Sequence, residues 1–361
     1  MRYKKYTLAE LATIKYGKNQ KKVLSENGTI PIYGTGGLMG YATEALYSEP
    51  SVLIGRKGTI GKVKYVNHPF WTVDTLFYTI VNTDVVLPKY LYYVMSLIDL
   101  NNYNEGTTIP SLRTETLNRL EFDIPSLEEQ ELILSCLNPI DEKIELNSAI
   151  NENLQQQAQT IFTNMFGAED AALWESGILS DIAEITMGQS PSGNSYNEDG
   201  QGTVFFQGRA EFGFRFPAVR LFTTEPKRMA LKNDTLMSVR APVGDLNIAH
   251  EDCCVGRGLA AIRTKDNHQS FVHYTMFSLQ KELDVFNGEG TVFGSINRNS
   301  LNAMPIKLPP KELIDEFENL VSPIDALILS NHDATCRLQA IRDTLLPKLL
   351  SGELDVSNLD I

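Results

Sequence analysis

The sequence is poor in cysteine, histidine and tryptophan, and it contains no long apolar run. Among 361 residues there are 4 cysteines, 5 histidines and 2 tryptophans. No stretch approaches the roughly 18 consecutive apolar residues of a membrane-spanning helix. The first residues, Met1 to Tyr6, lead into no apolar signal segment. We therefore expect a soluble, cytoplasmic protein that has no membrane partner.

The few cysteines argue against a structural metal. Cys136, Cys253, Cys254 and Cys336 lack the CxxC spacing of zinc sites and have few histidines near them. We therefore assign no metal site and expect buried free thiols. A redox role for the adjacent pair Cys253 and Cys254 is the alternative.

The net charge of −13 argues at first against nucleic acid, because phosphate binding needs Lys and Arg. The charge is unevenly distributed, however. Residues 1–125 carry 14 basic and 11 acidic side chains, and residues 175–309 carry 13 and 15. Residues 126–174 carry 1 basic against 9 acidic, and residues 310–361 carry 4 against 10. The acidic excess lies in two connecting segments, so each larger segment can still present a cationic face.

The most informative feature is an internal duplication. When residues 105–141 are shifted by 184 positions, 11 of 37 pairs are identical, whereas about two or three are expected by chance. Residues 18–50 and 189–230 hardly match. Shorter matches extend toward the start of each copy: Leu11–Gly17 with Ile182–Gly188, and Leu53–Gly61 with Leu236–Gly244. This pattern indicates one scaffold, used twice, with two different recognition surfaces.

The duplication divides the chain into two larger domains and two connectors. The domains cover residues 1–125 and 175–309, and the connectors cover 126–174 and 310–361. Short strands mixed with a few helices predict an α+β fold rather than alternating βαβ units. The clearest predicted strands are 51–54, 72–81, 203–207 and 254–263, and the clearest helices are 89–97 and 273–280.

Each connector is predicted to be a long helix. Ser126 and Glu129 form a capping box at the start of the first. Asn138-Pro139 and Ser322-Pro323 each place an N-cap residue before a proline, so we expect each helix to restart there at a kink.

Apolar residues recur at heptad spacing along both connectors. Asn147 and Asn331 occupy the same step of the two seams, as expected of buried polar residues that fix the register. The matched seams favour an antiparallel coiled coil that acts as a spacer. The alternative is that each helix packs only on its own domain.

Enzymatic motifs are incomplete. Gly55–Val63 resembles a phosphate-binding loop, but Arg56 replaces its first glycine and Val63 replaces the Ser or Thr that binds Mg²⁺. Tyr33–Gly37 is glycine-rich but lacks the helix that a dinucleotide site requires. No Ser-His-Asp or Cys-His constellation is evident. We therefore assign no catalytic residue and expect a binding protein.

Basic and amide side chains accompany the glycine-rich loops. Arg and Lys recognise guanine edges, and Asn and Gln recognise adenine edges. For any single residue the alternative is a solvated surface charge, but Arg56 and Lys57 are repeated as Arg240, and Ser111 is repeated as Ser295. The candidate DNA-binding residues are Lys18, Asn19, Gln20, Tyr33, Arg56, Lys57, Lys62, Thr107, Ser111, Arg113, Gln189, Gln207, Arg209, Arg240, Arg257, Thr291, Ser295, Asn297 and Arg298.

Five short motifs follow one another along the chain: Leu11–Gly17 with Ile182–Gly188, Ile30–Gly37, Arg56–Gly61, Ile124–Gln130 and Leu345–Gly352. The second helix start, residues 308–314, lacks the glutamine of the first. In the order of these motifs and in their duplication, the chain resembles, along nearly its whole length, the DNA specificity subunits of type I restriction-modification systems.

The resemblance implies two target recognition domains, 1–125 and 175–309, each of which reads half of a split, asymmetric double-stranded DNA target. Spacer helices would dock two copies of an adenine-N6 DNA methyltransferase and, for restriction, a DNA-translocating nuclease. S-adenosylmethionine, ATP and Mg²⁺ would belong to those partners, and this chain would hold no cofactor.

Two other interpretations remain open. One domain could carry an unrecognised methyltransferase or nuclease site. Alternatively, the chain is a non-DNA scaffold protein whose acidic coiled coil bridges two protein partners.

Overall fold

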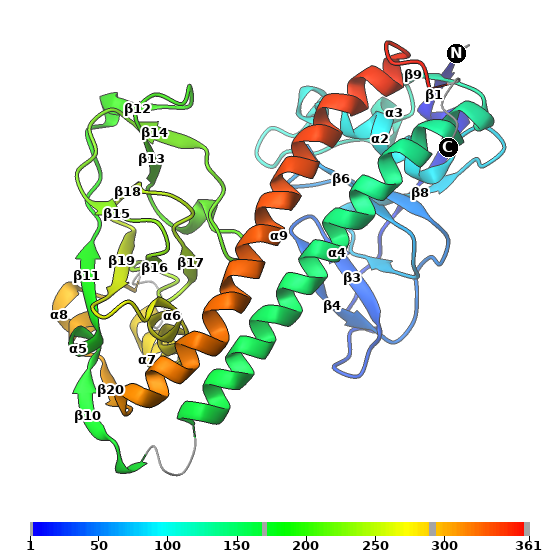
Figure 1. The fold of residues 1–361 in the computed structure, drawn as a ribbon. Coiled ribbons are helices and arrows are strands. Elements are labelled where there is room, and N and C mark those ends of the chain that lie inside the picture. Colours follow the sequence, from blue (N-terminus) through cyan, green and yellow to red (C-terminus); the bar gives the residue numbers. More distant parts are fainter. Residues whose placement is uncertain (1–2, 168–171, 289–293, 357–361) are drawn as a thin grey trace. The chain divides into compact units, whose positions relative to one another are not determined.

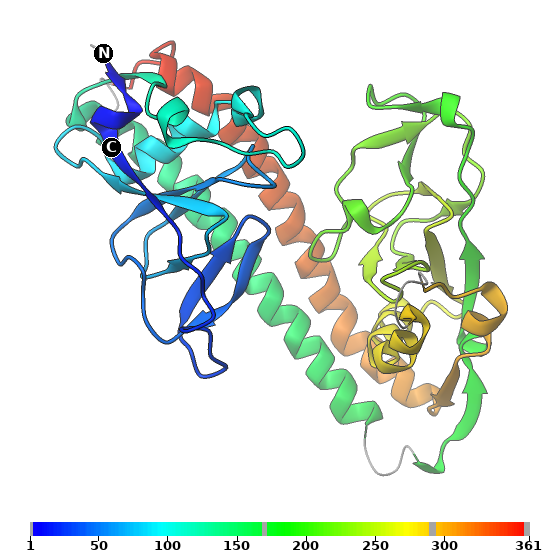
Figure 2. The ribbon, with the colours of Figure 1, turned by 180° about the vertical axis from the view of Figure 1, so that it is seen from behind.

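A computed structural model describes residues 3–167, 172–288 and 294–356. The chain forms two compact units. Unit 1 comprises residues 1–147 and 333–361, and unit 2 comprises residues 148–332. Each unit contains one domain of short strands and helices together with parts of two long helices (Figures 1 and 2). Within the described ranges, none of the helices combines the length and apolar character needed to cross a membrane.

Unit 1 is built on two sheets and a terminal strand pair. The first sheet is antiparallel, and β3 and β7 of the second are parallel. The first sheet has the order β2 (Ala12–Tyr16), β8 (Leu76–Val81), β5 (Ser51–Gly55), β6 (Val63–Val66); the second has the order β4 (Gly37–Ala42), β3 (Ile30–Gly34), β7 (Trp71–Thr72); and β1 (Lys4–Thr7) pairs with β9 (Glu121–Ile124). Its short helices are α1 (Leu8–Leu11), α2 (Pro88–Ser96) and α3 (Thr114–Leu117).

Unit 2 repeats this frame. The parallel pair is β13 with β18, as β3 is with β7 in unit 1. The first sheet has the order β11 (Ala183–Met187), β19 (Leu259–Thr264), β16 (Thr235–Ser238), β17 (Leu246–Ile248); the second has the order β12 (Tyr196–Asn197), β14 (Leu221–Thr223), β13 (Thr203–Phe206), β18 (Cys253–Val255), β15 (Met229–Ala230); and β10 (Glu175–Ile178) pairs with β20 (Pro305–Leu308). Its short helices are α5 (Leu179–Ile182), α6 (Gln269–Ser278), α7 (Gln280–Asp284) and α8 (Arg298–Asn302). The predicted α+β fold with internal duplication is confirmed.

Two of the predicted strands are each broken in two. Residues 72–81 divide between β7 and β8, and residues 254–263 divide between β18 and β19. In both units the chain leaves the second sheet and joins the first at this point. The break therefore has a physical reason, because a single straight strand cannot belong to both sheets. The predicted helix at 273–280 begins earlier, as α6.

The long helices are α4 (Leu127–Phe166) and α9 (Lys311–Ser351). The predicted capping box is confirmed, since Ser126 N donates to Glu129 Oε2 (3.0 Å) and Glu129 N donates to Ser126 Oγ (3.3 Å). The predicted restarts are wrong, because Pro139 and Pro323 lie inside continuous helices. A proline removes one backbone hydrogen bond, but buried apolar residues occur on both sides of Pro323, at Val321 and Ile328. Packing of the whole helix outweighs the local loss.

The two long helices pair in antiparallel fashion within each unit. In unit 1, Asn147 Nδ2 donates to Thr335 Oγ1 (3.2 Å). In unit 2, Asn331 Nδ2 donates to Asn151 Oδ1 (2.9 Å), and Asn151 Nδ2 donates to the carbonyl oxygen of Ile328 (3.1 Å). Residue 147 is equivalent to 331 in the duplication, and 151 is equivalent to 335. The same polar contact is therefore made twice, and the predicted coiled coil is confirmed.

Candidate nucleic-acid interface

A glycine ends the first sheet strand of each domain and brings the next residue against the neighbouring strand. A Cβ atom at Gly17 would lie 2.0 Å from a backbone carbonyl oxygen, and one at Gly188 would lie 2.1 Å from another. The residues that follow are held by equivalent backbone hydrogen bonds, of 2.8 Å for Lys18 N and 2.9 Å for Gln189 N. Both side chains are exposed. Candidate residues in the two domains therefore start from the same backbone position.

The basic loop that follows β5 in unit 1 and β16 in unit 2 pairs with the equivalent serine-containing loop in both units. Lys57 forms an isolated antiparallel bridge with Ser111 in unit 1, and Arg240 forms one with Ser295 in unit 2. Adjacent backbone hydrogen bonds of 2.9 and 3.1 Å join these two loops at equivalent positions. The repeated sequence thus produces a repeated junction of a basic loop with a serine-containing loop.

In unit 2 this junction opens into two adjoining surface recesses. Arg240, Arg257 and Ser295 line one recess, and Gln207, Arg209, Arg240 and Arg257 line the other. Arg240 and Arg257 are exposed and shared by both. No acidic residue lines either recess among the residues that the structure describes. Exposed guanidinium groups in this setting can contact phosphate oxygens or the O6 and N7 atoms of guanine.

In unit 1, Arg56 is held in a defined orientation. Its Nη1 donates to the carbonyl oxygen of Asp74 (2.8 Å), and its guanidinium carbon lies 5.0 Å from the centre of the Tyr16 ring. Lys57 and Lys62 follow in the same loop and are exposed. An oriented arginine beside two exposed lysines is suited to a polyanionic surface.

Two of the candidate arginines form ion pairs. Arg113 Nε lies 3.1 Å from Glu105 Oε2, and Arg209 Nη1 pairs with Asp245 Oδ2. Both arginine side chains are about half exposed or more, and exposed ion pairs contribute little to stability. DNA phosphates can therefore compete for these two guanidinium groups.

Three other candidates have local structural roles. Asn297 Oδ1 accepts from Ser300 N (2.9 Å) and caps α8, and Asn19 Oδ1 accepts from Lys21 N (2.9 Å). The third, Tyr33, is buried, so its ring offers little surface to DNA. These contacts favour a scaffold role for the three side chains.

The remaining candidates differ in exposure. Thr107 and Arg298 are exposed and Gln20 is half-buried. Thr291 lies outside the described residues. Lys64 is a further exposed basic residue that no sequence motif singles out, and its Nζ lies 4.0 Å from the centre of the Tyr33 ring. The alternation of apolar and polar residues along β6 is the sequence signal for it, because this alternation places Lys64 on the exposed face.

The adjacent cysteines Cys253 and Cys254 follow one another in β18, so their side chains point to opposite faces of the sheet. Cys253 and Cys254 are both free and fully buried. Burial raises the pKa of the Cys253 thiol to about 12, so the reactive thiolate is scarce at neutral pH. The expectation of buried thiols therefore holds for this pair. It is wrong for Cys336, which is exposed, and Cys136 is only half-buried.

Comparison with known proteins gives consistent matches. Residues 2–156 and residues 172–343 each match the family described as "Type I restriction modification DNA specificity domain". The chain is 30% identical over 297 residues to the putative type I restriction enzyme MjaX specificity subunit of Methanocaldococcus jannaschii, which covers 76% of this chain and 70% of that protein. It is 25% identical to the MjaIX specificity subunit of the same organism, over 87% of this chain and 80% of that protein.

A solved structure has the same fold. The type I restriction-modification system S subunit from M. genitalium superimposes with a TM-score of 0.59 at 18% identity, over 97% of this chain and 96% of that chain. The duplication seen in the sequence thus corresponds to two matches with one family, and the arrangement of elements has a structural counterpart.

Proposed function

We propose, for a chain that belongs to the type I restriction-modification DNA specificity family, that its two domains each read one half of a split, asymmetric DNA target. The repeated loop junction carries this proposal. Lys57 with Ser111 and Arg240 with Ser295 occupy equivalent places on equivalent frames. The segments that precede them, residues 18–50 and 189–230, differ. One frame with two sets of loops is what two unlike half-sites require.

The distribution of charge supports the same assignment. The excess of acidic residues lies in the segments that contain α4 and α9. The arginine-lined recesses lie instead on the domain of unit 2. DNA contacts from Arg240 and Arg257 would combine phosphate neutralisation with recognition of base edges.

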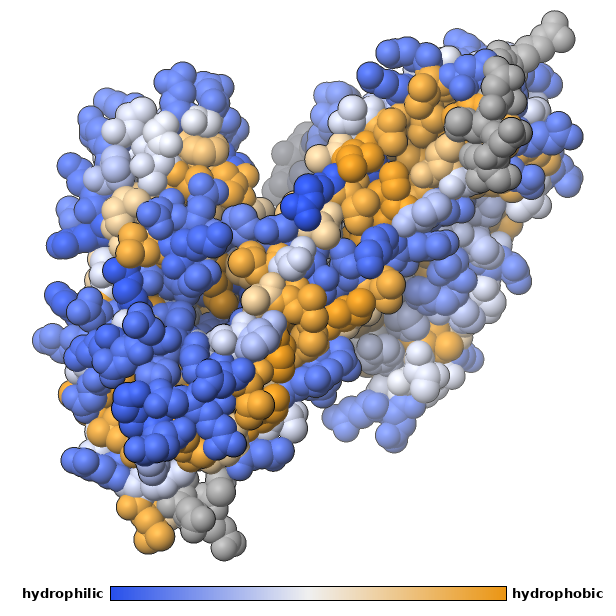
Figure 3. Space-filling view, in the orientation of Figure 1, coloured by the Kyte–Doolittle hydropathy of each residue, from blue (hydrophilic) through white to orange (hydrophobic). Residues whose placement is uncertain are grey.

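In this proposal the chain recognises the DNA sequence, and its partner subunits catalyse the reactions. Two copies of an adenine-N6 methyltransferase and, for restriction, a DNA-translocating nuclease would hold S-adenosylmethionine, ATP and Mg²⁺. Apolar side chains are exposed along the long helices (Figure 3), at Leu146 and Ile341 in unit 1 and at Leu320 and Leu327 in unit 2. Exposed apolar surface of this kind is typical of subunit interfaces.

The test is co-expression with a candidate methyltransferase subunit encoded by a neighbouring gene, followed by single-molecule sequencing of the host DNA. We expect N6-methyladenine at a split, asymmetric motif, and we expect it to disappear when this chain is omitted. If a stable complex forms and methylation is absent or unchanged, the proposal fails and a protein-bridging scaffold becomes the better explanation.

A second measurement addresses the enzymatic alternative. Isothermal titration of the isolated chain with S-adenosylmethionine should show no binding. Binding would place a methyltransferase site in this chain and contradict the division of roles.

A further inference from the structure

Each recognition domain is joined to a long helix by the same pair of residues. In unit 1, Tyr93 on α2 donates its hydroxyl proton to Asp141 on α4. In unit 2, Tyr274 on α6 donates to Asp325 on α9, with 3.0 Å between Oη and Oδ1. Asp141 and Asp325 are identical positions of the duplication, and each tyrosine precedes a methionine by two residues. The duplication therefore preserves one contact between domain and helix.

Both aspartates are largely buried and are neutralised by basic side chains. Asp141 lies 3.2 Å from Lys89 Nζ and 3.3 Å from Arg342 Nη1. A buried carboxylate is costly unless it is paired and hydrogen-bonded, so the position of the tyrosine hydroxyl beside Asp141 is strongly constrained. Burial raises the pKa of Tyr93 well above its ordinary value, which keeps this hydroxyl protonated as a donor.

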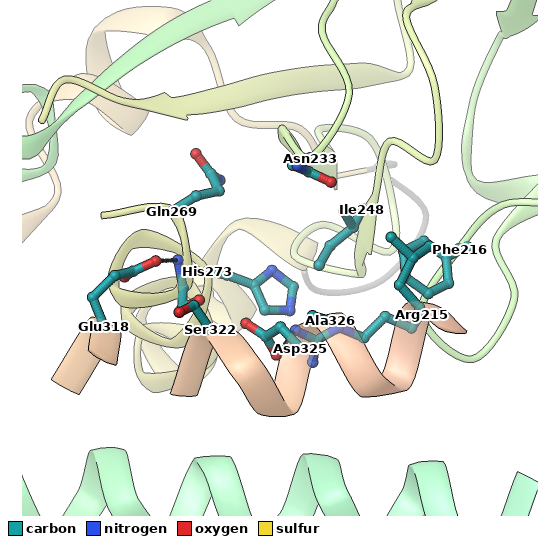
Figure 4. Close-up of a pocket in the computed structure, with 12 residues that line it drawn as sticks. Arg215, Phe216, Asn233, Ile248, Gln269, His273, Glu318, Ser322, Asp325 and Ala326 are labelled. Atoms are coloured by element: carbon teal, nitrogen blue, oxygen red, sulfur yellow. Dashed lines mark hydrogen bonds and ion pairs between the residues drawn. The ribbon is translucent and has the colours of Figure 1, made fainter. Parts of the chain in front are cut away.

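The counterpart in unit 2 uses one arginine for both partners. Arg215 is buried, and its Nη2 lies 2.5 Å from Asp325 Oδ1 while its Nη1 donates to Tyr274 Oη (2.9 Å). Figure 4 shows Arg215 and Asp325 together at the surface of α9. Arginine, tyrosine and aspartate thus form a closed triangle of hydrogen bonds.

A second contact lies along the same long helix in each unit. In unit 1, Gln130 Oε1 on α4 accepts from Leu87 N (2.8 Å), just before α2 begins. In unit 2, Glu318 on α9 accepts from Ser270 N and Phe271 N (both 3.1 Å), in the first turn of α6. Figure 4 draws one of the hydrogen bonds that Glu318 accepts. Each domain helix is therefore bound at its N-terminus as well as through its tyrosine.

The two contacts are in phase on their helix. Gln130 and Asp141 are 11 residues apart on α4, or about three turns, and Glu318 and Asp325 are 7 residues apart on α9, or about two turns. Both contacts of a pair therefore face the same side of the long helix. One contact alone would let the domain helix pivot, whereas two contacts fix its angle.

We propose that Tyr93 with Asp141 and Tyr274 with Asp325 are positioning residues that hold each recognition domain at one angle on its own helix segment. The consequence is strictness about the number of base pairs between the two half-sites. This inference rests on the proposed function, since it concerns how two half-sites are read together. Removing one hydroxyl leaves the packing of the ring intact and releases the angle.

The test uses Tyr93→Phe and Tyr274→Phe in the full chain, assembled with its methyltransferase partner. The DNA substrates carry both half-sites at the native separation or at separations one base pair shorter or longer. We expect the ratio of methylation at altered separation to methylation at native separation to rise about tenfold, which corresponds to about 1.4 kcal/mol. A purely structural role would lower methylation at every separation by one factor, and an unchanged ratio overturns the inference.

A matched control is Tyr196→Phe. The Tyr196 hydroxyl donates to the carbonyl oxygen of Pro191 (3.1 Å) inside the domain of unit 2, so its loss should leave the ratio unchanged. If a phenylalanine variant fails to assemble, Asp141→Asn and Asp325→Asn keep one acceptor oxygen but remove the negative charge that pairs with Lys89, Arg342 and Arg215, and they should raise the ratio in the same direction. If the native complex methylates no split site, the proposed function itself has failed. If it does so and every variant keeps the native strictness, only this inference fails.

Discussion

At the residue scale, the guanidinium group of Arg240 combines exposure with a fixed backbone. Its bridge to Ser295 sets where the side chain starts, and it lines both recesses of unit 2 beside Arg257. An arginine with these properties can present its planar guanidinium fork to the O6 and N7 atoms of guanine, whereas a lysine in its place keeps the charge for a phosphate contact but lacks that fork.

We expect Arg240→Ala to weaken DNA binding by the assembled complex by about 1–3 kcal/mol if the arginine reads a base. Arg240→Lys then separates the two kinds of contact, because it restores a phosphate contact and not a bidentate base contact. Binding should be measured by fluorescence anisotropy over a series of salt concentrations. Arg337→Ala, an exposed residue of α9, removes the same charge and serves as the control. Equal losses for Arg240→Ala and Arg337→Ala would show a general charge effect.

Which single residues the sequence could identify depended on how far their partners lie along the chain. Arg240 was identified because it is repeated. Asp325 was visible as an identity between the two copies, but its partners Tyr274 and Arg215 lie 51 and 110 residues away. No local pattern reveals such contacts. Arg215 in particular belongs to none of the repeated motifs.

At the element scale, capping residues and hydrophobic periodicity in the sequence predict the long helices and the clearest strands. The strands at 51–54 and 203–207 correspond to β5 and β13, and the helix at 89–97 corresponds to α2. The predictions are wrong at the two prolines and at the points where the chain passes from one sheet to the other. Local propensity at Pro139 predicts a break, but packing along the whole helix decides the outcome.

The glycine at the end of β2 provides an element-scale prediction. Gly17→Ala would place a Cβ 2.0 Å from a backbone carbonyl oxygen, and relieving such an overlap costs about 1–3 kcal/mol. We expect the free energy of unfolding to fall by that amount, measured by urea denaturation. Gly36→Ala is the control, because its Cβ would meet no atom within 4 Å. Equal effects of the two changes would contradict the close packing at Gly17.

At the scale of the whole molecule, the acidic excess of the helical segments is available to basic partner surfaces. Glu142, Glu145 and Glu152 are exposed on α4. We expect reversal of all three to Lys to abolish co-purification of the methyltransferase partner proposed above, because attraction to a basic partner surface is replaced by repulsion.

The matched control is reversal of three exposed carboxylates in the first domain, Glu26, Glu44 and Glu49, which changes the net charge equally. Retention of the partner by the helix variant, or its loss from both variants, would argue against a specific electrostatic interface on α4.

The two units also differ in how they can arise during synthesis. Unit 2 is continuous from residue 148 to 332, whereas unit 1 combines residues 1–147 with residues 333–361. Leu346, Leu349 and Val356 are buried in the same core as Phe77 and Ile133. During synthesis the core of unit 1 is therefore incomplete until the end of α9 has been translated, although most of unit 1 is translated first. Unit 2 has all its residues earlier and can complete its core before unit 1, which reverses the usual order of co-translational folding.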